Sequence, residues 1–216
     1  MCGRFSLHFS KDKLLKALAL NLPEGFEYEP DYNISPGREI LALRENALTP
    51  MHWGLRTPQN FHVNARLETA DSAPRFRESW EEKRCLIPAN GFYEWLNDGV
   101  RKQAHYIAPT DEAALYFAGL WFPSKNDTFA AHCVILTTNA QEPLQAIHHR
   151  MPVCIPTNAH KHWLTNKTTK ADAVQFTNEL SFQAHGVSSR VNGSQHHDAS
   201  LIRPTTPQSD DQMQFF

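Results

Sequence analysis

The second residue of the chain is a cysteine, in the opening sequence MCGRF. Removal of Met1 would give Cys2 two nucleophiles on adjacent carbons, a free α-amine and a thiol. An α-amine attacks an aldehyde to form an imine, and the neighbouring thiol can then add to the imine carbon and close a five-membered ring. Taken alone, however, Cys2 is better interpreted as an incidental small residue at a chain end.

Three further segments place polar side chains among aromatic or apolar ones, namely VNARLE, IPANGFYEW and IHHRMPV. Polar groups in such surroundings are typical of concave sites. Glu94 lies between Tyr93 and Trp95, where burial would raise its pKa and suit it to proton transfer near neutral pH. An exposed strand position is an equal alternative. Asn64 could hydrogen-bond within a site or cap a following helix.

The sequence gives no reason to expect a metal or a cofactor. Among the twelve histidines, His148 and His149 are adjacent. The side chains of neighbouring residues on a helix point about 100° apart, so the two would not both face one metal ion. There is no H-E-x-x-H spacing, and none of the nine glycines belongs to a phosphate-binding G-x-x-x-x-G-K loop.

Composition predicts a folded protein of one domain, because 216 residues can bury a full core and 41% of them are hydrophobic. The four cysteines are far apart and form no C-x-x-C pair, so reduced thiols are expected. Without a signal segment or a long apolar run, the protein is expected in the cytoplasm. A net charge of −2 argues against coating of nucleic acid by bulk charge, but it leaves room for a local basic groove.

The elements that would position these side chains are mostly short. Ser10 predicts the start of a helix, and residues 22–37 read as a loop. Helices are expected over residues 11–20, 63–70, 72–80, 142–149, 158–164 and 171–180. Strands are expected over residues 39–44, 49–55, 84–96 with a turn inside, 151–156 and 187–192, and as a meander over 104–109, 114–121 and 129–138. A strand-rich centre with scattered helices indicates an α+β fold.

In combination, the motifs become specific. MCGRF, YNISPG, MHWGL, VNARLE, RCLIPANGFYEW, AGLW, TTNA, IHHRMPV and VSSRVN, in this order, closely resemble the SRAP family of SOS-response-associated peptidases. The resemblance runs from Met1 to about Pro204. It implies a single SRAP domain over residues 1–204 with a mainly antiparallel β core flanked by short helices, followed by a flexible tail over residues 205–216.

The resemblance also implies a reaction. Cys2, exposed by loss of Met1, would crosslink as a thiazolidine to abasic sites in single-stranded DNA and shield the lesion during the DNA damage response. The family's catalytic residues correspond to Cys2, Asn64, Glu94 and His148. His148 is chosen over His149 because the family pattern is His-x-Arg-Met-Pro. Glu94 would shuttle protons, His148 would assist sugar ring-opening or hold a phosphate, and Asn64 would orient Cys2.

The protein would bind the DNA through its phosphate backbone and by stacking of aromatic side chains on its bases, with little specificity for the DNA sequence. The candidates to clamp phosphates are Arg4, Arg66, Arg75 and Arg150. The candidates to stack or wedge beside the flanking bases are Trp53, Trp95 and Pro36. Weak strand-cleaving lyase activity is a further expectation, because an imine at an abasic site permits β-elimination.

Two other classes of function stay open. A thiol peptidase would use Cys2 as nucleophile with Glu94 or His148 as base. A non-catalytic module would bind damaged single strands and would tolerate replacement of Cys2.

The tail adds a possible partner. Its sequence QMQFF resembles the peptide that bacterial replication proteins insert into the sliding clamp, with Gln212 leading and Phe215 and Phe216 filling an apolar pocket. Such a contact would place the protein at replication forks in the nucleoid.

Overall fold

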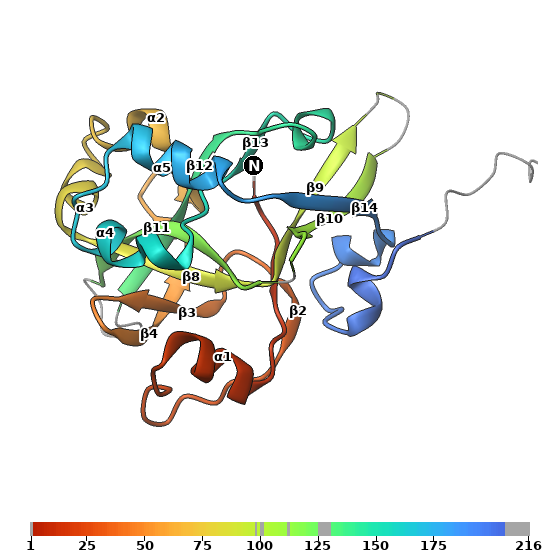
Figure 1. Cartoon of the computed structure of the whole chain (residues 1–216), viewed down its shortest axis with the longest axis horizontal. Coiled ribbons are helices and arrows are strands. Elements are labelled where there is room, and N and C mark those ends of the chain that lie inside the picture. Colours follow the sequence, from red (N-terminus) through yellow and green to blue (C-terminus); the bar gives the residue numbers. More distant parts are fainter. Residues whose placement is uncertain (1, 98, 100–101, 112, 125–130, 206–216) are drawn as a thin grey trace, which may run out of the picture.

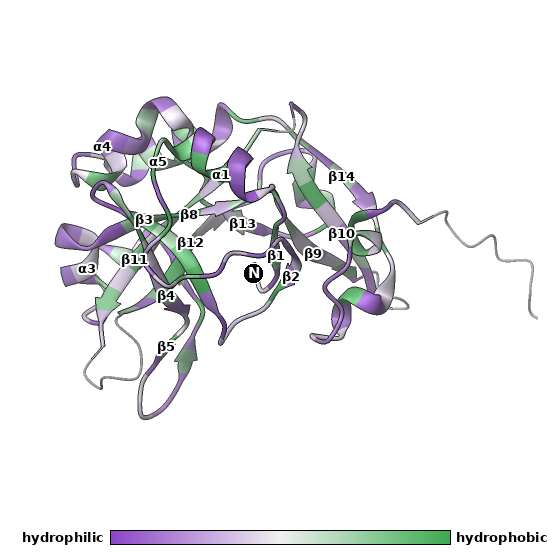
Figure 2. Ribbon diagram, turned by 90° about the horizontal axis from the view of Figure 1, so that it is seen from below, coloured by the Kyte–Doolittle hydropathy of each residue, from purple (hydrophilic) through white to green (hydrophobic). Residues whose placement is uncertain are grey.

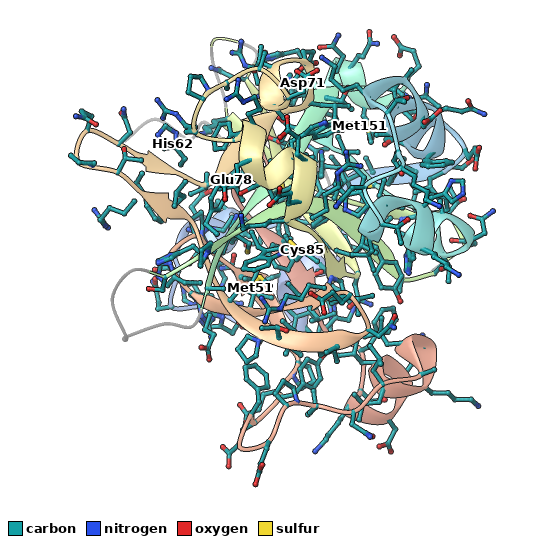
Figure 3. The ribbon with its side chains drawn as sticks, turned by 90° about the vertical axis from the view of Figure 1, so that its left-hand side faces the viewer. Met51, His62, Asp71, Glu78, Cys85 and Met151 are labelled. Carbon is teal, nitrogen blue, oxygen red and sulfur yellow. The ribbon has the colours of Figure 1, made fainter. Side chains whose placement is uncertain are left out.

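Five strands close into a barrel, which lies on the left of Figure 1. The computed structural model describes residues 2–97, 99, 102–111, 113–124 and 131–205. Closure arises because β11 pairs with both β8 and β12, while β12 also pairs with β4. Met51 and Cys85 are buried in this core (Figure 3). The barrel strands are β3 (Glu39–Arg44), β4 (Ala47–Trp53), β8 (Arg84–Ala89), β11 (Leu115–Pro123) and β12 (Ala131–Asn139).

The C-terminal half of β12 has a short strand on each edge. Thr137 pairs with Arg66 of β7 (Asn64–Arg66) and with Pro152 of β13 (Arg150–Pro152), so the two short strands lie on opposite sides of β12. The β7 pairing is parallel and the β13 pairing is antiparallel. β12 therefore brings together two segments that are far apart in the sequence.

A second sheet packs beside the barrel. The order of its strands is β14-β10-β9-β1-β2. Phe5 joins the two, because its ring packs edge-on against Trp53 at 5.1 Å and Phe117 at 5.7 Å between ring centroids. The strands of this sheet are β1 (Phe5–Leu7), β2 (Asp31–Ile34), β9 (Gly91–Asn97), β10 (Lys102–Pro109) and β14 (Phe182–Gly186). In the chain, β1 thus begins three residues after Cys2.

The helices lie outside the sheets, and local signals mark where two of them begin. The Ser10 side chain caps α1 (Lys11–Leu18), and Thr169 with Asp172 forms a capping box for α5 (Lys170–Asn178). None of the helices described is long and apolar enough to span a membrane. The remaining ones are α2 (Leu67–Ala70), α3 (Arg77–Glu82), α4 (His160–Leu164) and the 3-10 turns η1 (Leu144–Ala146), η2 (Thr157–Ala159), η3 (Ser189–Asn192) and η4 (Ala199–Ile202).

A two-stranded hairpin of β5 (Leu55–Arg56) and β6 (Phe61–His62) projects from the barrel (Figure 2). It starts at Gly54, whose φ of +125° favours glycine and whose hypothetical Cβ would lie 2.2 Å from the Phe61 ring. The hairpin therefore needs a glycine at its base.

The predicted fold class is confirmed: the core is mainly antiparallel β structure with short helices around it. The predicted meander is wrong, because β10 pairs with β9 and β14 in the second sheet, whereas β11 and β12 belong to the barrel. The segment 22–37 is not entirely loop either. Residues 31–34 form β2, because they pair with β1.

Three further predictions need correction. Residues 187–192 do not form a strand, because the Ser188 side chain accepts a hydrogen bond from the Arg190 amide and caps η3. The helix expected over 142–149 is reduced to η1, because the chain must return for Arg150 to pair with Asn139. The start of the 63–70 segment is strand β7 rather than helix, because it pairs with β12.

Candidate active site

Cys2 lies at the junction of the two sheets and has no exposed surface. The Asn64 side-chain amide donates a hydrogen bond of 2.8 Å to the Cys2 carbonyl. The Cys2 Sγ lies 3.8 Å from the carbonyl oxygen of Arg4, as a weak donor. Burial, followed by the negative charge of Glu94, raises the pKa of the Cys2 thiol well above its ordinary value. The thiol is therefore protonated at neutral pH.

Glu94 reaches the same place from β9. Phe92 pairs with Phe5, and the Tyr93 amide donates to the Arg4 carbonyl at 2.9 Å, so β9 runs beside the first residues of the chain. Glu94 is only 3% exposed, and this burial raises the pKa of its carboxyl group. The carboxyl group therefore keeps its proton at pH values where an exposed glutamate has lost it.

His148 approaches Glu94 from the connection between η1 and β13. Its Nδ1 lies 3.9 Å from Glu94 Oε1 and 3.0 Å from both the amide nitrogen and the carbonyl oxygen of Arg150. Burial lowers the pKa of His148, which favours the neutral imidazole. His149 is exposed and stacks on the His148 ring at 4.4 Å between centroids.

The structure thus brings the four predicted catalytic residues together, although they come from four separate segments. The group combines an aminothiol after Met1 removal, a carboxyl group with a raised pKa, a neutral imidazole and an amide that holds the Cys2 main chain. Such a set can attack a carbonyl carbon and move protons to and from the adduct. Within the described part of the chain, no group of three or more His, Cys, Asp or Glu side chains could hold a metal.

The predicted DNA-contacting residues divide by exposure. Arg66 and Arg75 are exposed, and Arg75 hydrogen-bonds to His62 of the projecting hairpin, labelled in Figure 3. Pro36 and Trp95 are half-buried. Arg4 is partly engaged inside the protein.

Arg4 and Trp95 are both tied to η3. Arg4 donates to the Asn33 side chain at 2.8 Å and to the Val191 carbonyl at 3.0 Å. Trp95 Nε1 donates to the Asn192 side chain at 2.9 Å. These contacts fix the orientation of both side chains.

Two of the predicted DNA contacts do not fit their positions. Trp53 has no exposed surface, and its Nε1 donates to the Val63 carbonyl at 3.0 Å, so it is a core residue that cannot stack on a base. Arg150 is 8% exposed and is paired with Glu68. Its guanidinium is occupied inside the protein and is not presented to a phosphate.

The sequence analysis did not single out Asn33 and Glu68. Asn33 lies in the YNISPG motif and donates from one buried amide to the carbonyls of Val191, Gly193 and His196. Glu68 lies in VNARLE, where only its neighbours had been considered. Their inclusion in these motifs was the available signal, but the carbonyls that bind the Asn33 amide and the Arg150 that pairs with Glu68 lie 82 or more positions away.

Comparisons with known proteins give the family. The model of the SOS response associated peptidase (SRAP) family matches residues 1–194. The abasic site processing protein YoaM of Bacillus subtilis is 35% identical over 94% of this chain and 97% of its own length. The abasic site processing protein YedK of Escherichia coli is 28% identical over 94% of this chain and 100% of its own.

A solved structure shows the same fold. A protein from Bacteroides thetaiotaomicron superimposes with a TM-score of 0.78 at 21% sequence identity, covering 95% of this chain and all of the other. The match to the family model over residues 1–194 and the 35% identity to YoaM show the family: the chain belongs to the SRAP family.

Proposed function

We propose that this protein processes abasic sites in single-stranded DNA by forming a covalent thiazolidine crosslink through Cys2 after loss of Met1. The observation that carries the proposal is the convergence of Asn64, Glu94 and His148 on an N-terminal cysteine. The names of the relatives YoaM and YedK, which are abasic site processing proteins, point to the same lesion.

The first half of the reaction uses the α-amine. An opened abasic sugar presents an aldehyde, and the Cys2 nitrogen attacks its carbon to give a carbinolamine. Protonated Glu94 donates its proton to the hydroxyl group, which leaves as water, and a protonated imine forms that keeps its N–H hydrogen. Burial prepares Glu94 for this step, because it keeps the carboxyl group protonated at a higher pH.

The second half uses the thiol. The Glu94 carboxylate accepts the Cys2 thiol proton as sulfur bonds to the carbon of the protonated imine. The electron pair of the C=N bond moves to nitrogen, so the ring nitrogen is neutral and Glu94 is protonated again. One water is lost overall and no redox partner is needed. His148 assists the opening of the sugar or contacts the adjoining phosphate. Because the site holds the aldehyde against Cys2, both additions are effectively intramolecular. For ideal geometry this lowers the activation barrier by about 7–11 kcal/mol.

The DNA backbone is contacted by the exposed Arg66 and Arg75, with Arg4 at the inner end of the path. Trp95 and Pro36 pack beside the bases that flank the lesion. Because the reacting nucleotide has no base, this arrangement discriminates little between sequences.

The raised pKa of the Cys2 thiol favours this reaction over peptidase chemistry. Thiol peptidases depend on a thiolate with a lowered pKa, whereas burial and the Glu94 charge keep Cys2 protonated. In thiazolidine formation the amine attacks first, and the thiol adds to an already activated imine. Slow β-elimination from that imine accounts for a secondary lyase activity.

The test is intact mass spectrometry of the protein incubated with a single-stranded oligonucleotide carrying one abasic site. We expect a denaturation-resistant adduct whose mass equals protein plus oligonucleotide minus one water. Cys2→Ser retains the amine and has a hydroxyl group in place of the thiol, so it should form an imine that borohydride traps. Cys2→Ala isolates the same amine without a hydroxyl group.

A form that retains Met1, made with methionine aminopeptidase inhibited, is the second control and should give no adduct. If wild-type protein lacking Met1 forms no adduct, the proposal is wrong. If the form retaining Met1 reacts equally well, the α-amine has no role and a thiol-only mechanism replaces it.

We also propose that the tail docks on the replication sliding clamp through Gln212, Phe215 and Phe216, which lie outside the described residues. Deletion of residues 212–216 should abolish clamp binding in a direct affinity measurement and leave crosslinking intact. Unchanged affinity would remove this proposal without affecting the first.

A further inference from the structure

We propose that Glu68 is a positioning residue for His148, acting through an ion pair with Arg150. The inference deepens the proposed function and rests on it for its catalytic consequence. The structural part concerns the orientation of His148 alone and can be tested without DNA.

Glu68 supplies the counter-charge of a buried guanidinium. Arg150 Nη1 lies 2.6 Å from Glu68 Oε1, and Nη2 lies 2.8 Å from Oε2, so the pair is bidentate. The guanidinium also donates to the Thr137 carbonyl at 2.6 Å and to the Asn139 side chain at 2.8 Å. An Arg150 side chain that is 8% exposed needs such a partner, because a buried charge left unpaired is strongly destabilising.

These contacts fasten the first residue of β13 to β12 and α2. Arg150 pairs with Asn139 through the main chain, and its side chain reaches across β12 to Glu68. Glu68 belongs to α2, whose C-terminal end is marked by Asp71 in Figure 3. Because both the main chain and the side chain of Arg150 are held, its amide and carbonyl groups have fixed positions.

The same main-chain groups hold the imidazole of His148. The Arg150 amide donates to His148 Nδ1 at 3.0 Å when the ring is neutral, which leaves the ring hydrogen on Nε2. When the ring is protonated, Nδ1 can instead donate to the Arg150 carbonyl, also at 3.0 Å. Glu68 therefore determines the tautomer of His148 and the direction of its Nε2–H group through Arg150.

Other charged groups also face His148. Glu94 approaches from β9, His149 stacks on the ring, and the Arg150 charge lowers the pKa of His148 after the larger effect of burial. Glu68 offsets the Arg150 charge. Neutralisation of Glu68 should therefore lower the His148 pKa further.

The experiment compares Glu68→Gln with Asp71→Asn. Asp71 is a matched control, because it lies at the end of the same helix and pairs with Lys170 at 2.6 Å. The first readout is the nitrogen chemical shifts of His148 in histidine-labelled protein across a pH titration, without DNA. We expect the Nε2–H tautomer in wild type and Asp71→Asn, and a mixture of tautomers with a lower pKa in Glu68→Gln.

The second readout is the crosslinking rate. Glu68→Gln should lose roughly tenfold, which is a fraction of the 10²–10⁴ that a positioned proton-transfer group contributes. Asp71→Asn should stay within about twofold of wild type. Glu68→Asp keeps the carboxylate and should recover part of both readouts.

Wild-type nitrogen shifts for His148 in Glu68→Gln would overturn the inference, whatever the rate. If Glu68→Gln fails to fold, the nitrogen shifts of His148 in Glu68→Asp test the inference instead. Because the aspartate side chain is shorter, the ratio of the two His148 tautomers must still differ from that in wild type. If no protein forms a crosslink, wild type included, the proposed function fails while the nitrogen shifts still judge the positioning role.

Discussion

Asn33 offers a sharp test of how the site is held together. Its side chain has no exposed surface and links the start of the chain to the segment after β14. The amide donates to the carbonyls of Val191, Gly193 and His196 at 3.3, 3.0 and 2.8 Å, and its oxygen accepts from Arg4 at 2.8 Å. Asn33→Ala removes all of these contacts and leaves an empty space between two segments.

The size of the effect follows from the donors. The amide has two hydrogens, so the three carbonyls share two full hydrogen bonds, each with a net value of about 0.5–1.5 kcal/mol, and the bond from the Arg4 cation adds about 1.5–3 kcal/mol. The free energy of unfolding should therefore fall by roughly 2.5–6 kcal/mol. For a domain of this length that corresponds to a decrease in Tm of about 5–24 °C.

Thermal unfolding followed by circular dichroism measures the loss, and Asn90→Ala is the control. The Asn90 side chain accepts one hydrogen bond, from the His8 amide at 2.7 Å, so its removal should change stability by only about 1 kcal/mol. Asn33→Ala should also slow crosslinking, because the groups that orient Arg4 are lost. If the two variants were equally stable, the reasoning from hydrogen-bond number would be refuted.

Four other substitutions give distinct outcomes. Glu94→Gln should slow crosslinking by about 10²–10⁴ at unchanged DNA affinity in gel and anisotropy assays. Burial raises the Glu94 pKa, so the wild-type protein loses stability as the pH rises from the ordinary glutamate pKa through the raised one. In thermal melts at different pH values, Glu94→Gln should therefore be more stable than wild type above that pH window and show no such gain below it. Arg66→Ala should reduce the slope of log affinity against log salt by about 0.7, and an unchanged slope would exclude a phosphate contact. Trp95→Ala should weaken single-strand binding by about 1–3 kcal/mol with the fold intact. Trp53→Ala should instead destabilise the fold by about 3–5 kcal/mol in denaturant titrations, and the reverse pattern would contradict our assignment of the two tryptophans.

The parts of the fold that were predicted from the sequence are those with local signals. The start of α1 is set by Ser10 and that of α5 by Thr169, each within one turn of the helix that it caps. β10 and β11 were both predicted as strands. The pattern of apolar residues along a strand does not identify its pairing partner, so the sequence did not predict that the two belong to different sheets. VSSRVN was predicted as a strand, whereas the Ser188 side chain caps the 3-10 turn η3 there.

The site follows the same division. The ordered motifs led to Cys2, Asn64, Glu94 and His148, which the structure places together. They did not distinguish an exposed arginine from a buried one, because burial depends on segments distant in sequence. Arg150 and Trp53 were therefore assigned to the DNA, although both lie inside the protein. Glu68 escaped notice for the same reason, since its partner lies 82 positions further along the chain.

The burial of residue 2 also has a consequence for biosynthesis. Arg4 donates to the Val191 carbonyl across 187 positions, and Asn64 donates to the Cys2 carbonyl across 62. Contacts of such long range form late and slowly in folding. The contact of Arg4 can form only after residue 191 has been synthesised. Residue 2 therefore gains its full set of surrounding partners late, and it is accessible to other proteins until then.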